Sequence, residues 1–198
     1  MGEIVVVQNV TLDGVMQAPG GAEEDTRGGF GFGGWARPYA DQVSAATMGK
    51  GMGADGAMLF GRRTYTQFHG FWARQEDGNP YTEVLNRKTK YVVSRTLTEP
   101  LPWQNSVLLA GEATAAVAKL KAEVAGPVVV LGSGVLVRAL AAADLVDQYV
   151  LSIHPLTLGA GTTLFGEGAT PYRKLTLIDT VTTTTGVIIA SYRRAVTG

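Results

Sequence analysis

The chain has 198 residues, no cysteine, and 17 basic against 17 acidic side chains. This length suits one domain with a sizeable core, so we expect a single domain over residues 1–198. The net charge of zero gives no overall attraction to nucleic acid or to anionic membranes, and the lack of cysteine excludes disulfides and thiolate metal sites. Because no signal segment opens the chain and no apolar run approaches about 18 residues, the sequence predicts a cytoplasmic protein.

The first half of the chain predicts three strands, each followed by a turn or a helix. A β-branched run, IVVVQNV, predicts a strand covered on both faces, and a glycine-rich stretch at 18–34 predicts a long loop that could cover a substrate. Pro38 suits the first turn of a helix. Strands are expected at 4–10, 57–60 and 90–94, with helices at 38–48 and, briefly, after residue 64.

The second half continues the alternation and ends in a hairpin. Apolar residues from Ala113 to Val124 fall at helical spacing, and Gly126-Pro127 ends that helix. Two further strands follow, with a helix between them, and the tail reads as two strands around a turn at Thr185-Gly186. The expected ranges are strands at 128–131, 148–154, 175–184 and 187–193, and a helix at 135–143.

Strands that alternate with helices predict an α/β fold with a mainly parallel central sheet, helices on both faces and a C-terminal antiparallel hairpin. In such sheets, ligands bind beyond the carboxyl ends of the strands. The segments that directly follow the predicted strands are therefore the places to look for a site.

One of these segments, Gly132-Ser133-Gly134, joins a buried strand to a helix beginning near Val135. The first N–H groups of a helix lack internal partners and carry partial positive charge, so this turn is a candidate phosphate site. The dinucleotide fingerprint is incomplete, because Val137 stands where a third glycine would fall and no acidic residue follows at the usual distance. A standard Rossmann domain is therefore disfavoured.

Two other strand ends carry arginine beside a hydroxyl. Gly61-Arg62-Arg63-Thr64 opens a helix, and Ser94-Arg95 ends a strand. Arginine forks onto phosphate oxygens and a hydroxyl can donate to the same group. With the glycine turn, these two segments predict a cradle for a phosphorylated cofactor.

The chain resembles the dihydrofolate reductase superfold, and more closely the reductase domain of riboflavin biosynthesis and its stand-alone bacterial relatives. The resemblance is carried, in chain order, by VQNVTLDG, LFGRRTY, YVVSR, VVVLGSG and HPLTLGAGTTLF. It implies a homodimer that binds NADPH, with the nicotinamide near residues 9–14. It implies that these residues hold the cofactor: Gly61, Arg62, Thr64, Ser94, Arg95, Gly132, Ser133, Gly134 and Val135.

Two aspartates are the candidates for catalysis. Dihydrofolate reductases carry an acidic residue early in their first long helix, and the nearest counterpart here is Asp41. The resemblance also favours Asp13 on the substrate side of the nicotinamide. Both have structural alternatives, Asp41 as a first-turn acid of a helix and Asp13 as a turn residue before Gly14. His154, at a strand end, is interpreted as structural, and no histidine–carboxylate spacing suggests a metal.

These features predict an NADPH-dependent reductase of a small ring-containing or carbonyl substrate. One alternative is a phosphorylated ribosylamino-pyrimidine substrate, as in riboflavin biosynthesis, which needs further cations; Arg27, Arg37 and Arg173 are the candidates. A second alternative is a nucleotide-binding protein without catalysis. Neither nucleic acid nor a membrane is expected as a partner.

Overall fold

The computed structural model describes residues 1–198 apart from 54–55, 76–77, 79, 167–170 and 196–198. Short 3₁₀ turns at 27–29 and 37–39 precede the first α-helix. The strands are β1 (Glu3–Thr11), β2 (Ala57–Gly61), β3 (Lys90–Val93), β4 (Ser106–Leu109), β5 (Pro127–Leu131), β6 (Gln148–His154), β7 (Leu175–Thr182) and β8 (Ile188–Arg194). The helices are α1 (Gln42–Gly53), α2 (Arg62–Trp72), α3 (Pro80–Arg87), α4 (Ala113–Glu123) and α5 (Gly134–Ala142).

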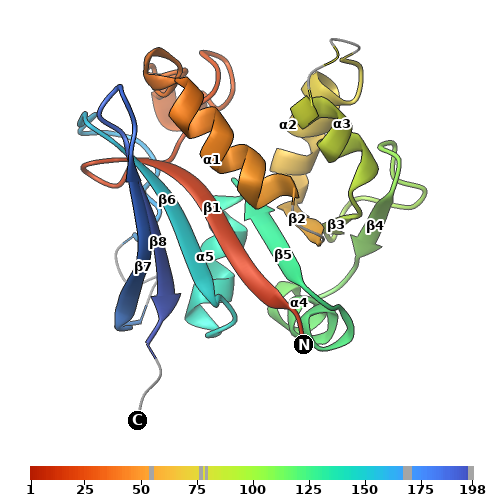
Figure 1. The fold of residues 1–198 in the computed structure, drawn as a ribbon. Helices are drawn as coiled ribbons and strands as arrows, with labels where there is room; N and C mark the ends of the chain where they lie inside the picture. Colours follow the sequence, from red (N-terminus) through yellow and green to blue (C-terminus); the bar gives the residue numbers. More distant parts are fainter. Residues whose placement is uncertain (54–55, 76–77, 79, 167–170, 196–198) are drawn as a thin grey trace.

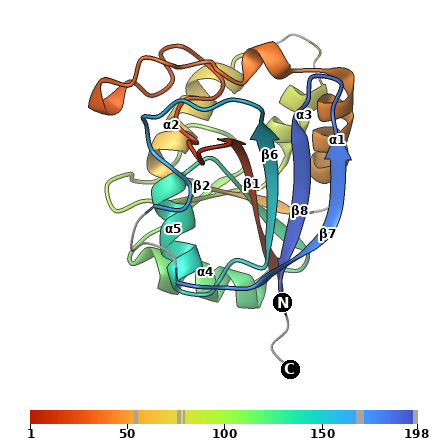
Figure 2. The same ribbon diagram turned by 90° about the vertical axis from the view of Figure 1, so that its left-hand side faces the viewer.

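The strands form one eight-stranded sheet in the order β4-β3-β2-β5-β1-β6-β8-β7 (Figure 1). All pairs from β4 to β6 are parallel. Only the last two pairs, β6–β8 and β8–β7, are antiparallel, and β7 lies at the edge beyond β8 (Figure 2). The predicted α/β class with a C-terminal antiparallel hairpin is therefore confirmed.

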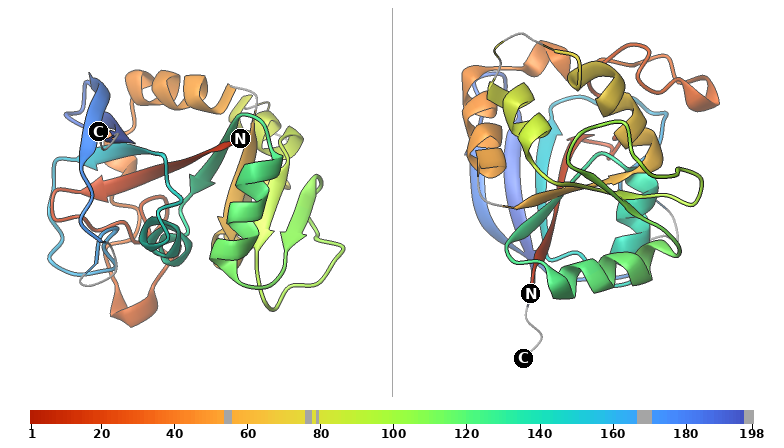
Figure 3. Two further views of the ribbon diagram at one scale, coloured as in Figure 1. Left: turned by 90° about the horizontal axis from the view of Figure 1, so that it is seen from below. Right: turned by 90° about the vertical axis from the view of Figure 1, so that its right-hand side faces the viewer.

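Helices cover both faces of the sheet, as the strand alternation predicts (Figure 3). On one face, Ile4 and Val6 of β1 pack with Leu140 of α5 and other residues of α4 and α5. On the other face, Met58 and Phe60 of β2 pack with residues of α2 and α3. Successive side chains of a strand point to opposite faces, so the apolar runs of β1, β2 and β5 fill two cores.

Lys90, at the start of β3, is fully buried, which is unusual for a lysine. Its Nζ donates to the carbonyl oxygens of Leu85 at 2.8 Å, Lys88 at 2.7 Å and Asn86 at 3.3 Å, and it lies 4.7 Å from the centre of the Trp103 ring. These carbonyls belong to the last turn of α3 and the residue after it, where helical partners run out. The ammonium group therefore closes the C-terminal end of α3 and ties it to β3.

The structure corrects two of the sequence-based boundaries and adds two elements. The first helix begins at Gln42 rather than at Pro38, because residues 37–39 form a 3₁₀ turn and Asp41 accepts from the backbone N–H of Ser44 at 2.7 Å. The first strand of the hairpin ends at Thr182, since the next four residues form its turn. Helix α3 and the edge strand β4 were not predicted at all.

Candidate functional site

A cleft of about 1210 Å³ opens at the carboxyl ends of β1, β2, β3 and β5. Parallel strands bring these ends to one edge of the sheet, so residues far apart in sequence meet there. All nine residues expected to hold the cofactor line this cleft: Gly61, Arg62, Thr64, Ser94, Arg95, Gly132, Ser133, Gly134 and Val135.

The glycine turn after β5, Gly132-Ser133-Gly134, has a backbone conformation that favours glycine. Gly132 and Ser133 both have positive φ, 61° and 62°, and a Cβ on Gly132 would lie 3.0 Å from Cγ2 of Thr64. The Ser133 Oγ accepts from the backbone N–H of Gly61 at 2.9 Å. This bond joins the turn before α5 to the turn before α2, and it fixes the two helix starts against each other.

The N-termini of α2 and α5 have no side-chain cap, and neither helix has an acidic residue in its first turn. By contrast, the Glu112 carboxylate caps α4 by accepting from the backbone N–H groups of Thr114 at 3.0 Å and Ala115 at 2.8 Å. These hydrogen bonds, with that of the Thr114 hydroxyl as the largest cause, lower the pKa of Glu112 to about 2. Of the helix starts described in the cleft lining, those of α2 and α5 therefore retain donors for a bound anion, whereas that of α4 does not.

Arginine side chains add full positive charge to this part of the cleft. Within the described residues, no ion pair engages Arg62 or Arg95. The neighbouring Ser94 is buried, and its Oγ accepts from the backbone N–H groups of Thr96 at 3.1 Å and Leu97 at 3.0 Å. Ser94 thus shapes the turn that presents Arg95, a role its sequence position alone did not indicate.

Two buried glutamines support the site and were missed by the sequence analysis. Gln8 of β1 donates through Nε2 to the carbonyl oxygen of Gly132 at 2.6 Å, which anchors the glycine turn to the central strand. Gln17 is 6% exposed and holds the long loop: its Nε2 donates to the carbonyls of Asp25 and Arg27, each at 3.0 Å. The sequence did carry a signal for each glutamine: Gln8 is a polar residue within an otherwise apolar strand, and Gln17 is a polar residue beside the long loop.

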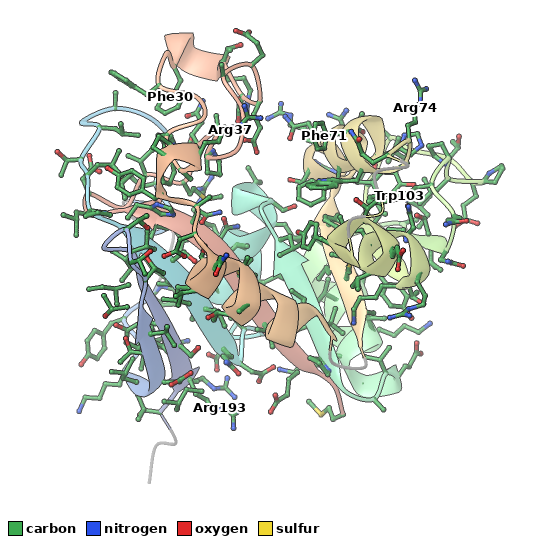
Figure 4. All side chains as sticks on the ribbon, turned by 45° about the horizontal axis from the view of Figure 1, so that its top comes forward. Phe30, Arg37, Phe71, Arg74, Trp103 and Arg193 are labelled. Atoms are coloured by element: carbon green, nitrogen blue, oxygen red, sulfur yellow. The ribbon has the colours of Figure 1, made fainter. Side chains whose placement is uncertain are left out.

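The long loop reaches across the cleft, and residues 23–27 form part of the lining. The backbone carbonyl of Glu24 accepts a hydrogen bond from the Gln67 side chain of α2. Figure 4 shows Phe30 and Arg37 on the side of this loop and Phe71 on α2 opposite. The loop is therefore attached to both walls and covers part of the cleft.

Neither catalytic candidate lines the cleft in this structure. The Oδ2 of Asp13 accepts from the backbone N–H groups of Leu158 at 3.1 Å and Gly159 at 2.7 Å, and its Oδ1 accepts from the Thr11 hydroxyl. The Thr11 hydroxyl, and next the N–H of Gly159, lower the pKa of Asp13. Its contacts favour the turn role, and the catalytic role stays a prediction.

Asp41 likewise uses both carboxylate oxygens within the fold. Oδ1 caps α1, while Oδ2 accepts from the backbone N–H and the hydroxyl of Thr184, both at 2.6 Å, in the turn between β7 and β8. The Thr184 hydroxyl is the main cause that holds the pKa of Asp41 well below its usual range. The carboxylate therefore connects the start of α1 to the C-terminal hairpin, and its catalytic role also stays a prediction.

These two lowered pKa values predict a loss of stability in acid. A carboxylate whose pKa is lower in the folded chain stabilises the fold above its unfolded pKa, and that contribution fades as the pH falls below about 4. We expect Asp41→Asn to reduce the free energy of unfolding at pH 7 and to flatten its decline in acid. Urea unfolding from pH 6 down to pH 3 measures this; an acid decline as steep as that of the wild type would contradict it.

The three arginines considered for a substrate phosphate are already engaged or lie elsewhere. Arg27 forms an ion pair with Asp25, and Arg37 donates to the carbonyl of Gly20 at 2.5 Å. Arg173 does not line the cleft and pairs with Asp144 at 3.1 Å. None of the three is placed as a free cation in the cleft.

His154 is buried at the end of β6, and its Nε2 lies 3.1 Å from Oδ1 of Asn9. Burial lowers the pKa of His154 to about 4, so the imidazole is neutral near pH 7. The rings of Trp35 and Tyr39 meet it edge-on, with centroids 5.1 and 5.4 Å away. Among the described residues, no cluster of three histidines or carboxylates suits a metal ion, and no helix is long and apolar enough to span a membrane.

An eight-stranded sheet of this order, with a cleft between helix starts at its carboxyl edge, is a dihydrofolate reductase-like fold. The chain belongs to the family described as the RibD C-terminal domain, which matches residues 3–189. This is a family of NADPH-dependent reductases, and the resemblance drawn from the sequence is confirmed.

Three known proteins are similar to this chain, two of them in fold and one in sequence. A putative riboflavin biosynthesis protein from Shewanella sp. PV-4 superposes with a TM-score of 0.68 at 24% identity, covering 98% of this chain and 99% of its own. A dihydrofolate reductase from Enterococcus faecalis, solved with NADP(H), gives 0.60 at 14% identity over 97% and 96%. In sequence, the uncharacterized Bacillus subtilis protein YyaP is 28% identical over 138 residues, 68% of this chain and 72% of YyaP.

Proposed function

We propose that this chain is an NADPH-dependent reductase that transfers a hydride to a small ring-containing or carbonyl substrate. One observation carries the proposal: two uncapped helix starts, joined by the Ser133–Gly61 hydrogen bond, open into one cleft beside Arg62 and Arg95. Backbone N–H groups and unpaired guanidinium groups together suit the phosphates of a dinucleotide. Family membership and the NADP(H) bound to a reductase of the same fold support it.

Each part of the cleft has a proposed task. The backbone at Gly132, Ser133, Gly134 and Val135, with Gly61, Arg62 and Thr64, would hold the pyrophosphate, and Ser94 and Arg95 would hold the adenosine phosphate. NADPH would supply the hydride, while the protein supplies orientation, electrostatics and exclusion of water. The loop held by Gln17 would cover the reacting end.

The alternative substrate is a phosphorylated ribosylamino-pyrimidine, which the name of the Shewanella relative favours. The engagement of Arg27 and Arg37 within the loop removes two of the cations considered for its phosphate. Cofactor binding without catalysis is the remaining alternative.

Calorimetric titration with NADPH, followed by NADPH oxidation over a panel of pterins, quinones, enones and phosphorylated ribosylamino-pyrimidines, tests the proposal. We expect NADPH to bind and one uncharged class to be reduced. Binding without oxidation of any compound would favour the non-catalytic alternative. Absence of NADPH binding would overturn the proposal.

We further propose a second copy of this chain as the partner of the C-terminal hairpin. Leu177 and Ile178 on the edge strand β7 are 51% and 48% exposed, and Ile188 on β8 is 44% exposed. Exposed apolar side chains on a sheet edge favour association. Light scattering after gel filtration should give a dimer for the wild type and a smaller species for Leu177→Glu; a monomeric wild type would contradict this.

A further inference from the structure

Two polar side chains lie side by side on the floor of the cleft. Asn9 of β1 and Ser152 of β6 are paired in register on neighbouring parallel strands, so they project from the same face of the sheet. Both line the cleft. Within the described part of the chain, neither the Asn9 Nδ2 nor the Ser152 Oγ has a hydrogen-bond partner, so both remain available to a bound molecule.

His154 fixes the orientation of the Asn9 side-chain amide through its contact with Oδ1. It lies on the same face of β6, two residues beyond Ser152, and is only 5% exposed. Its Nδ1 is buried without a partner, so the proton of the neutral ring belongs on Nε2, where it can be donated to Oδ1 of Asn9. With Oδ1 held in this way, the Nδ2 group of Asn9 is the part left for a ligand.

Charged residues are unevenly distributed among the elements that line the cleft. The elements that build this side of the cleft, β1, β6, α1 and α3, contribute only uncharged residues to its lining. Val7 of β1 and Tyr81 of α3 both pack against the apolar cluster around Phe60. Burial raises the pKa of Tyr81 to about 12, so its phenol stays neutral. The charged lining residues come instead from the long loop and from α2, α4, α5 and the end of β3.

We propose that Asn9 and Ser152 determine substrate specificity by receiving the polar edge of an uncharged planar ring, a carbonyl next to an N–H or O–H group, and that His154 is the residue that positions Asn9. The inference rests on the proposed function, because it assigns the acceptor side of the same cleft. Asn9 Nδ2 donates to the ring carbonyl, and the Ser152 hydroxyl accepts from or donates to the neighbouring group. A carboxylate or phosphate there would lose its hydration without a cation to replace it.

The test measures ring binding by ligand-observed NMR with NADP⁺ present, using 2-pyridone and its 5-carboxylate as matched probes. We expect the uncharged ring to bind the wild type at least about tenfold more tightly than the carboxylate. Asn9→Leu should weaken 2-pyridone binding about tenfold and change NADPH affinity by less, since the cofactor is held mainly through its phosphates. Gln148→Leu, on the same sheet face but outside the cleft lining, is the matched control and should change neither.

Two variants of His154 separate positioning from packing. His154→Phe keeps a ring against Trp35 and Tyr39 but removes the donor, whereas His154→Gln keeps an N–H donor and loses the ring. We expect His154→Phe to be the more heat-stable of the two and the weaker binder of 2-pyridone. If His154→Phe is both the more heat-stable variant and the equal or better binder of 2-pyridone, His154 serves packing alone and the positioning role fails.

The remaining outcomes are distinct. Equal or tighter binding of the carboxylate, unchanged 2-pyridone affinity in Asn9→Leu, or a wild type that binds NADPH but neither ring would overturn this inference and leave the cofactor site standing. A wild type that binds no NADPH would overturn the proposed function and, with it, this inference.

Discussion

Arg95→Ala is expected to weaken NADPH binding tenfold or more while leaving the affinity for NADH nearly unchanged. Arg95 is exposed on the cleft just after β3, and β3 lies beside β2, which leads into α2 at Gly61. This location places Arg95 two strands away from the glycine turn after β5, with β2 between them. We expect the pyrophosphate of NADPH on the glycine turn and its additional phosphate beside Arg95. A charge-assisted hydrogen bond contributes about 1.5–3 kcal/mol, which is roughly tenfold to a hundredfold in affinity.

Titration of both cofactors against the wild type and Arg95→Ala measures this difference. Arg87→Ala is a suitable control, because Arg87 is also an exposed arginine but lies on α3 away from the cleft lining. Raising the salt concentration should weaken NADPH binding more in the wild type than in Arg95→Ala. Equal losses of affinity for NADPH and NADH in Arg95→Ala would show that Arg95 does not bind the additional phosphate of NADPH.

Lys90→Met is expected to lower the free energy of unfolding by about 3 kcal/mol, a large part of the stability of an ordinary domain. Methionine nearly fills the same volume but donates no hydrogen bond, so the carbonyls of Leu85, Asn86 and Lys88 lose the partner they now share. Those carbonyls are at a helix end packed against β3, and unsatisfied buried acceptors are costly.

Urea unfolding at neutral pH, followed by circular dichroism, checks this value. Lys119→Met serves as the control: the Lys119 side chain is 77% exposed, and its contact with Glu123 spans 3.9 Å, so its loss should matter little. A change in Lys90→Met no larger than that of the control would mean that the buried ammonium group contributes nothing net. NADPH binding by the folded variant should persist, since Lys90 does not line the cleft.

Much of the fold was predictable because its strands carry strong local signals. The β-branched runs of β1 and β5 and the apolar periodicity of α4 and α5 identify these elements with errors of one or two residues. By contrast, the edge strand β4 reads SVLL and has one β-branched residue, whereas the equally short β3 reads KYVV and carries a tyrosine and two valines, which favour strands. Helix α1 starts where Asp41 caps it. The sequence analysis instead placed the start at Pro38, because proline is favoured in the first turn of a helix.

The site was predictable where chemistry follows a strand end, and not where it depends on tertiary contacts. Strand-end reasoning selected Arg62, Arg95 and the glycine turn, which do meet in one cleft. The family resemblance placed Asp13 and Asp41 near the chemistry, although their oxygens accept hydrogen bonds from segments about 145 residues away in sequence. No local sequence pattern predicts such distant partners. The hydrogen bond from Gln8 to Gly132 could not be predicted for the same reason.

A crystal structure of the chain grown with NADPH tests the central claim most directly. The account predicts the dinucleotide in the cleft, with its pyrophosphate on the backbone of Gly134 and Val135, its adenosine phosphate on Arg95, and its nicotinamide toward Asn9. A dinucleotide bound outside this cleft, or one whose phosphates contact neither the glycine turn nor Arg95, would contradict it.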